Sequence, residues 1–177
     1  AQCYYAPAWV KTDTRRFRRA EIEKGKGFIR MKDFYDMPYT SLSYLCEETM
    51  RADARAFGRL MAFIREIDGN EHTVVSMQIE NETGVMGAAR EHSDEADTLF
   101  ASPVPGDFAR SMRSAVNTMT PDMKKAVENG KPSGTWSEVF GPEAEEVFSA
   151  YHIARYVNTV AEAGKKEYSL PFSVNCW

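Results

Sequence analysis

The sequence predicts an α/β fold with two parallel strands, and three patterns support this. From about Glu47, apolar residues recur at helical spacing with arginines between them, which predicts an amphipathic helix. Residues 72–79 are rich in β-branched and apolar side chains without polar alternation, as in a strand covered on both faces. A long helical pattern from near Pro142 precedes a second apolar strand, 168–177. Two strands separated by helices predict a parallel pair, which occurs in doubly wound sheets and in eight-stranded barrels.

The chain divides into three expected regions of one domain. Residues 1–49 show no sustained period of 2 or 3.6 and are expected to form a long loop region. Residues 50–84 are expected to hold the first helix and strand, and residues 85–177 a helical connection and the next strand. Within that connection, residues 108–128 predict short helices, and residues 135–138, Thr-Trp-Ser-Glu, have the spacing of a capping box.

Composition sets limits on the function. With 177 residues, 43% of them hydrophobic, the chain has single-domain size and enough apolar material for a packed core. A net charge of -4 gives no general attraction for nucleic acid or for an anionic membrane. No apolar run approaches the roughly 18 residues of a membrane span. We expect neither a metal nor another cofactor, because the cysteines and histidines lack ligand spacing: Cys3, Cys46, Cys176, His72, His92 and His152.

The first predicted strand ends in a polar cluster, Glu80-Asn81-Glu82. Active sites of parallel α/β folds lie at the carboxyl ends of their strands, so this cluster is the candidate site. Gln78, Glu80 and Glu82 share one face of an extended strand. Two carboxylates two residues apart are about 6–7 Å apart at their α-carbons, which is close enough for repulsion to raise one pKa, as a general acid requires. The alternative is that Glu80 is structural and Glu82 caps the strand.

Residues 78–84, QIENETG, resemble the fourth-strand motif of the β-galactosidases of glycoside hydrolase family 35, and the Asn-Glu pair is shared with family 42. Residues 4–17, YYAPAWVKTDTRRF, are similar to the loop after the third strand of that family. SGTWSEVFG and YHIARYV resemble the segment before the fifth strand, and LPFSVNCW, residues 170–177, resembles that strand. The flanking segments point to a bacterial branch. The resemblance implies a partial (β/α)8 TIM barrel holding about strands 4 and 5 with their helices.

The same resemblance implies a retaining glycosidase that cleaves terminal β-galactosides. It makes Glu82 the general acid/base that protonates the glycosidic oxygen, and it makes Asn81 a hydrogen-bond partner of the sugar 2-hydroxyl. Glu80 and Gln78 would support the site. Sugar C–H faces stack on indole rings, so Trp9 and Trp177, with Asn175 beside the latter, are further expected substrate contacts, although tryptophan is also a common core residue.

A retaining enzyme also needs a carboxylate nucleophile, which the family takes from its seventh strand. The resemblance therefore implies that this sequence is the central fragment of a catalytic domain, inactive by itself. We expect exposed strand edges to promote self-association. The alternative is a non-catalytic α/β domain that binds carbohydrate through Trp9, Trp177 and Asn81. Because relatives are often exported, the resemblance favours a secreted or periplasmic location.

Overall fold

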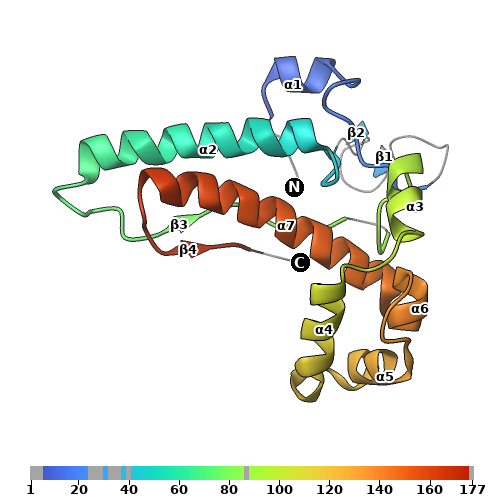
Figure 1. The fold of residues 1–177 in the computed structure, drawn as a ribbon. Coiled ribbons are helices and arrows are strands. Elements are labelled where there is room, and N and C mark those ends of the chain that lie inside the picture. Colours follow the sequence, from blue (N-terminus) through green and yellow to red (C-terminus); the bar gives the residue numbers. More distant parts are fainter. Residues whose placement is uncertain (1–5, 24–29, 32–36, 39–40, 86–87, 176–177) are drawn as a thin grey trace.

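The computed structural model describes residues 6–23, 30–31, 37–38, 41–85 and 88–175, and this part of the chain is mostly helical (Figure 1). Its two longest helices, α2 (Glu47–Asp68) and α7 (Ala144–Glu167), lie side by side and run in the same direction. The other helices are short: α1 (Ala8–Thr12), α3 (Asp94–Phe100), α4 (Gly106–Ser114), α5 (Pro121–Asn129) and α6 (Trp136–Phe140), with 3-10 turns η1 (Val116–Thr118) and η2 (Gly141–Glu143). Among the described residues, no helix has the length and hydrophobicity needed to cross a membrane.

The strands of the described residues are two residues long. Strands β1 (Arg30–Met31) and β2 (Met37–Pro38) pair antiparallel. Strands β3 (Met77–Gln78) and β4 (Phe172–Ser173) pair parallel. Met77 lies opposite Phe172 and Gln78 opposite Ser173, so the ends of β3 and β4 lie level with each other.

The expected partial (β/α)8 barrel is wrong: the described chain is mostly helical, with only the short pair β3–β4 in the place of the expected strands 4 and 5. The reason is the lack of neighbours. In the part that the structure describes, β3 and β4 pair only with each other, and an extended segment without a partner has no ladder to extend. Val75 and Val174, expected to be buried on both faces of a sheet, are 71% and 40% exposed.

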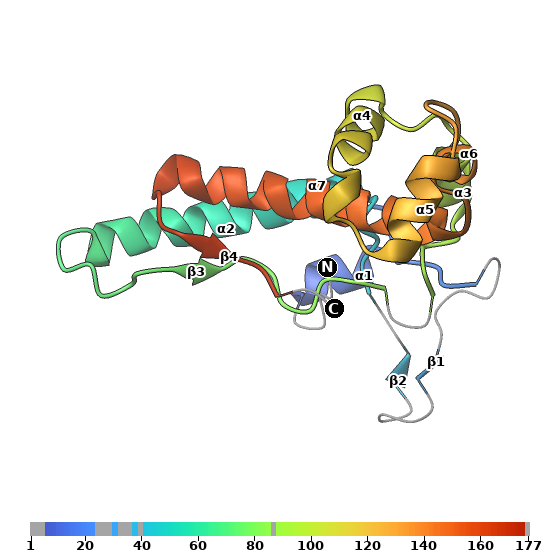
Figure 2. The same ribbon diagram turned by 90° about the horizontal axis from the view of Figure 1, so that it is seen from below.

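The helices α2 and α7 form the core that carries β3 and β4. Gly164 of α7 allows close contact, since a Cβ added there would lie only 2.3 Å from a ring carbon of Phe57. The two strands lie along one side of this helix pair (Figure 2). Phe172 of β4 packs edge-on against Phe57, with ring centroids 5.4 Å apart. The buried members of this cluster are Phe57, Met61, Ile64, Tyr156 and Val160, with Met77 and Ile79 packed against them.

A second apolar core lies where α4, α5 and α6 meet the first half of α7. Trp136, Phe140 and Phe148 are almost completely buried there. The predicted capping box is confirmed at the start of α6: Thr135 Oγ1 accepts from the Glu138 N–H, and Glu138 Oε2 accepts from the Thr135 N–H. The box satisfies backbone N–H groups at the start of α6, which packs against α7.

Candidate functional site

The polar residues that follow β3 and β4 meet at one place. The side-chain oxygen Oδ1 of Asn81 accepts hydrogen bonds from Gln78 Nε2 at 3.0 Å and from Asn175 Nδ2 at 3.1 Å. Backbone bonds hold the same segments together, since Asn175 N–H donates to Glu80 O and Thr83 N–H donates to Asn175 O. Both bonds to Asn81 end on its oxygen, so the N–H donors of the same amide are left for another acceptor.

Glu82 follows directly in an unusual backbone conformation. Its φ is 51°, in the left-handed region that non-glycine residues seldom adopt. The neighbours on both sides are held: Asn81 by two side-chain bonds and the buried Thr83 by its bond to Asn175. Strained backbone of this kind costs about 1 kcal/mol or more, and it persists only where the surroundings enforce it, often at functional sites. The Glu82 side chain itself is half-buried.

Glu80 lies against helix α2 rather than beside Glu82. Burial, and then the charge and the hydrogen bond of Asp53, raise the pKa of Glu80 to about 8. Asp53 in turn accepts a hydrogen bond of 2.9 Å from the Tyr156 hydroxyl of α7. The carboxylate that perturbs Glu80 is therefore Asp53, from a distant helix, and not Glu82 two residues away as the spacing had indicated. A protonated Glu80 links the end of β3 to α2 and α7.

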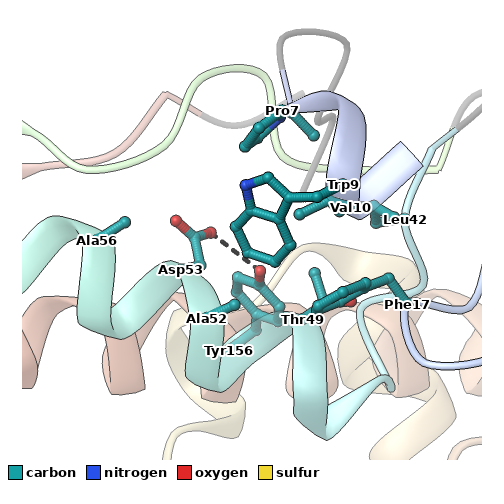
Figure 3. Close-up of a pocket in the computed structure, with 11 residues that line it drawn as sticks. Pro7, Trp9, Val10, Phe17, Leu42, Thr49, Ala52, Asp53, Ala56 and Tyr156 are labelled. Carbon is teal, nitrogen blue, oxygen red and sulfur yellow. Dashed lines mark hydrogen bonds between the residues drawn. The ribbon is translucent and has the colours of Figure 1, made fainter. Parts of the chain in front are cut away.

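The Asp53–Tyr156 pair also forms one wall of a cavity between α1, α2 and α7 (Figure 3). The cavity has a volume of about 320 Å³. Trp9 of α1 lies over Asp53 and Tyr156, and its ring meets Phe17 edge-on with centroids 5.3 Å apart. Apart from these polar groups and Thr49, the walls are apolar: Ala6, Pro7, Val10, Leu42, Ala52 and Ala56.

The structure therefore brings together some of the expected site residues and separates others. Gln78, Asn81 and Asn175 touch, with Glu82 next to them in the chain. Trp9 lines the cavity instead. Asp53 belongs to both places, because it lines this cavity and is hydrogen-bonded to Glu80 at the end of β3. Trp177 lies outside the described residues. Among the residues that are described, no group of His, Cys, Asp or Glu side chains is arranged to hold a metal ion.

Three residues of this region were not predicted from the sequence: Thr49, Asp53 and Tyr156. A signal for Asp53 was present, because it falls on the buried stripe of α2, three residues after Met50 and four before Phe57. A carboxylate on an apolar stripe needs a partner, and the structure supplies two, Tyr156 and Glu80.

No protein-family model and no curated protein matches the chain.

Proposed function

We propose that this chain carries the acid/base part of a retaining glycosidase that acts on terminal β-galactosides, with Glu82 as the proton donor. One observation carries the proposal: Asn81 is fixed by Gln78 and Asn175 where two parallel strands end, and Glu82 follows it in a strained left-handed backbone. This arrangement supports the roles that the QIENETG motif implies for these two residues.

In the proposed mechanism, the Glu82 carboxyl group protonates the glycosidic oxygen as the bond to the sugar breaks. In the second step the resulting carboxylate takes a proton from the attacking water. Asn81 binds the sugar 2-hydroxyl through its amide N–H, since its oxygen already accepts from Gln78 and Asn175. Those two side chains thus orient the Asn81 amide before substrate arrives, which lowers the entropy cost of binding.

The nucleophile is the part of this mechanism that we place outside the chain. A retaining glycosidase needs a second carboxylate about 5–5.5 Å from the acid/base group, on the other side of the scissile bond. Glu80 does not fit this role because it is bonded to Asp53 of α2. We therefore expect the isolated chain to bind sugar but not to hydrolyse 4-nitrophenyl β-galactoside. Turnover by the purified chain that disappears in Glu82→Gln would contradict this part of the proposal.

Sugar binding is testable on the chain alone. We would titrate galactose into the ¹⁵N-labelled protein and follow the side-chain amide signals of Asn81 and Asn175 by NMR. Saturable shifts of both signals are expected, and Asn81→Ala should abolish the response. Asn129→Ala is the matched control, because Asn129 is an exposed asparagine of α5, a helix that lies apart from β3 and β4 (Figure 1).

The outcomes separate the candidate functions. Absence of any shift at Asn81 and Asn175 would contradict the proposal. Shifts confined to the Trp9 indole N–H would favour a domain that binds carbohydrate without cleaving it. Equal loss of binding in Asn81→Ala and Asn129→Ala would show that the response is not specific to the strand end.

A further inference from the structure

The cavity between α1, α2 and α7 has features that the strand-end cluster does not explain. Its walls come from separate segments of the chain, among them Trp9 of α1, Asp53 of α2 and Tyr156 of α7 (Figure 3). Its volume of about 320 Å³ is at the lower end of the range of small-molecule sites. An inference about its ligand does not depend on whether the chain belongs to a glycosidase.

Among the described residues, Asp53 is the only charged side chain that lines this cavity. Its carboxylate accepts a hydrogen bond of 2.9 Å from the Tyr156 hydroxyl and is also hydrogen-bonded to Glu80. Burial and Asp53 raise the pKa of Glu80 to about 8, so near pH 7 Glu80 keeps the shared proton and Asp53 keeps the negative charge. Neither of these two partners carries a positive charge that would neutralise Asp53.

The charge of Asp53 restricts the ligand, because any ligand that enters the cavity removes water from this carboxylate. A neutral ligand leaves the carboxylate desolvated without an opposite charge, which is unfavourable. An anion is repelled. A cation compensates for the lost water, and its attraction to a carboxylate is stronger in a partly dry cavity than in bulk water. The cavity therefore favours a cation.

The aromatic side chains of the wall favour the same charge. Trp9, Phe17 and Tyr156 line the cavity, and Trp9 is 56% exposed, so its indole is accessible. Aromatic faces attract cations, indole most strongly, and quaternary ammonium groups are recognised in this way. The Phe17 ring already attracts the Arg16 guanidinium, which lies 5.1 Å from its centroid. Arg16 does not line the cavity, and its charge is paired with Glu48 at 3.0 Å.

The rest of the wall decides which kind of cation fits. A primary ammonium group has three N–H donors, and Asp53 can accept only some of them, so the others would lose water without a partner. A trimethylammonium group has no N–H donor and presents only methyl groups to the wall. The Trp9 indole N–H is a donor that needs an acceptor, such as a ligand hydroxyl oxygen. Most of the remaining wall is apolar: Ala6, Pro7, Val10, Leu42, Ala52 and Ala56.

We propose that this cavity binds a small organic cation of the choline type, which is a trimethylammonium group joined to a short hydroxyalkyl chain. The trimethylammonium group lies beside the Asp53 carboxylate and against the Trp9 indole, and the hydroxyl oxygen supplies an acceptor for the Trp9 N–H. The charge of Asp53, the aromatic rings and the apolar walls each contribute to this choice.

The test uses choline and 3,3-dimethylbutan-1-ol as probes, which have the same shape but differ in charge, since a carbon atom replaces the charged nitrogen. We would measure the binding of each at pH 7 by isothermal titration calorimetry or ligand-observed NMR. Choline should bind saturably and at least about tenfold more tightly than the neutral alcohol. Ethanolamine, which has N–H groups in place of the methyl groups, should bind more weakly than choline.

Asp53→Asn tests the charge, because it removes the charge and keeps an oxygen that can accept from Tyr156. It should weaken choline binding by about tenfold and leave the binding of the neutral alcohol unchanged. Asp107→Asn is the matched control. Asp107 is an exposed residue in the first turn of α4 and does not line the cavity, so this substitution makes the same change in net charge elsewhere.

Two further variants test the location. Trp9→Leu keeps an apolar side chain and removes the aromatic face, so it should weaken choline binding by about threefold to fivefold and affect the neutral alcohol less. Ala56 lines the cavity and is exposed, so Ala56→Leu fills the space without crowding the core. It should weaken both probes, because the added methyl groups occupy the ligand's volume.

Four results would each overturn the proposal. They are absence of saturable choline binding to the unaltered chain, equal affinities for choline and the neutral alcohol, tighter binding of ethanolamine than of choline, and equal effects of Asp53→Asn and Asp107→Asn. Far-UV circular dichroism and a thermal melt show whether each variant is folded. If Asp53→Asn does not fold, unchanged choline binding in Trp9→Leu and Ala56→Leu overturns the proposal instead.

Discussion

Replacing Glu80 by glutamine tests the carboxyl pair that joins β3 to α2. In the folded chain the pKa of Glu80 is raised from 4.5 to about 8 by burial and by Asp53. In the unfolded chain the same group has its ordinary pKa. The protonated form therefore stabilises the fold fully below about pH 4.5, and this stability is lost as the pH rises towards 8.

The magnitude follows from the size of the shift. Each unit of pKa difference is equivalent to about 1.4 kcal/mol, which would give about 5 kcal/mol for an isolated and fully buried group. Glu80 is only partly buried and shares its proton with Asp53. We therefore expect a smaller loss, about 2 kcal/mol between pH 5 and pH 8. Glutamine cannot ionise and its amide can still donate to Asp53, so Glu80→Gln should remove this pH dependence.

The assay is urea denaturation followed by far-UV circular dichroism at several values between pH 5 and pH 9. Near pH 5 the two proteins should have similar free energies of unfolding, and at pH 8 or above Glu80→Gln should be the more stable by about 2 kcal/mol. Glu82→Gln is the matched control and should keep the slope that Glu80 produces. Parallel stability curves for the unaltered chain and Glu80→Gln would refute the reasoning.

Three further substitutions test the packing and the strand end. Gly164→Ala should destabilise the fold by about 2–3 kcal/mol, because the new methyl group would lie 2.3 Å from a ring carbon of Phe57 in α2. Gly58→Ala is the comparison: a methyl group there would have its nearest atom at 3.4 Å, so this variant should be more stable by up to about 1 kcal/mol. Equal effects of the two substitutions in urea denaturation would contradict the close contact between α2 and α7. Tyr156→Phe removes the hydroxyl that donates to Asp53 and should cost about 1 kcal/mol, so an unchanged denaturation midpoint would argue against that bond. Glu82→Gly should stabilise the chain by up to about 1 kcal/mol, because glycine accepts a φ of 51° without strain, and a thermal melt showing a loss of stability would contradict the strain.

Local patterns predicted the helical parts of the fold well. The amphipathic stripe of α2 and the capping box before α6 are each contained within one segment, so the sequence alone is sufficient for them. The two strands were also placed correctly as a parallel pair. Their expected length and the barrel were wrong, because the extent of a strand depends on neighbouring strands, and in the described chain each has only one.

The candidate site divides in the same way. The parallel pairing explains why Asn175 lies beside Asn81, although the two are 94 residues apart in the sequence. Alternation along an extended strand puts Gln78 and Asn81 on opposite faces, so the bond between these two side chains is not expected from the sequence. The bond between Glu80 and Asp53 depends on how α2 packs on β3, and spacing along one strand contains no information on that packing. Spacing alone therefore suggested the wrong carboxylate neighbour for Glu80.

The most direct test of Glu82 as proton donor is affinity labelling with N-bromoacetyl-β-galactosylamine, a galactose derivative whose bromoacetyl group alkylates a nearby carboxylate. The chain would be treated with the reagent, with or without excess galactose, and the site of modification would be located by peptide mapping. Bromoacetamide, which lacks the sugar, controls for general alkylation of exposed nucleophiles, whereas Cys46 is buried. We expect an adduct on Glu82 that excess galactose suppresses, and we expect no such adduct in Glu82→Gln. If Glu82 is not modified, or if galactose does not suppress its modification, the role of Glu82 as the acid/base group is contradicted.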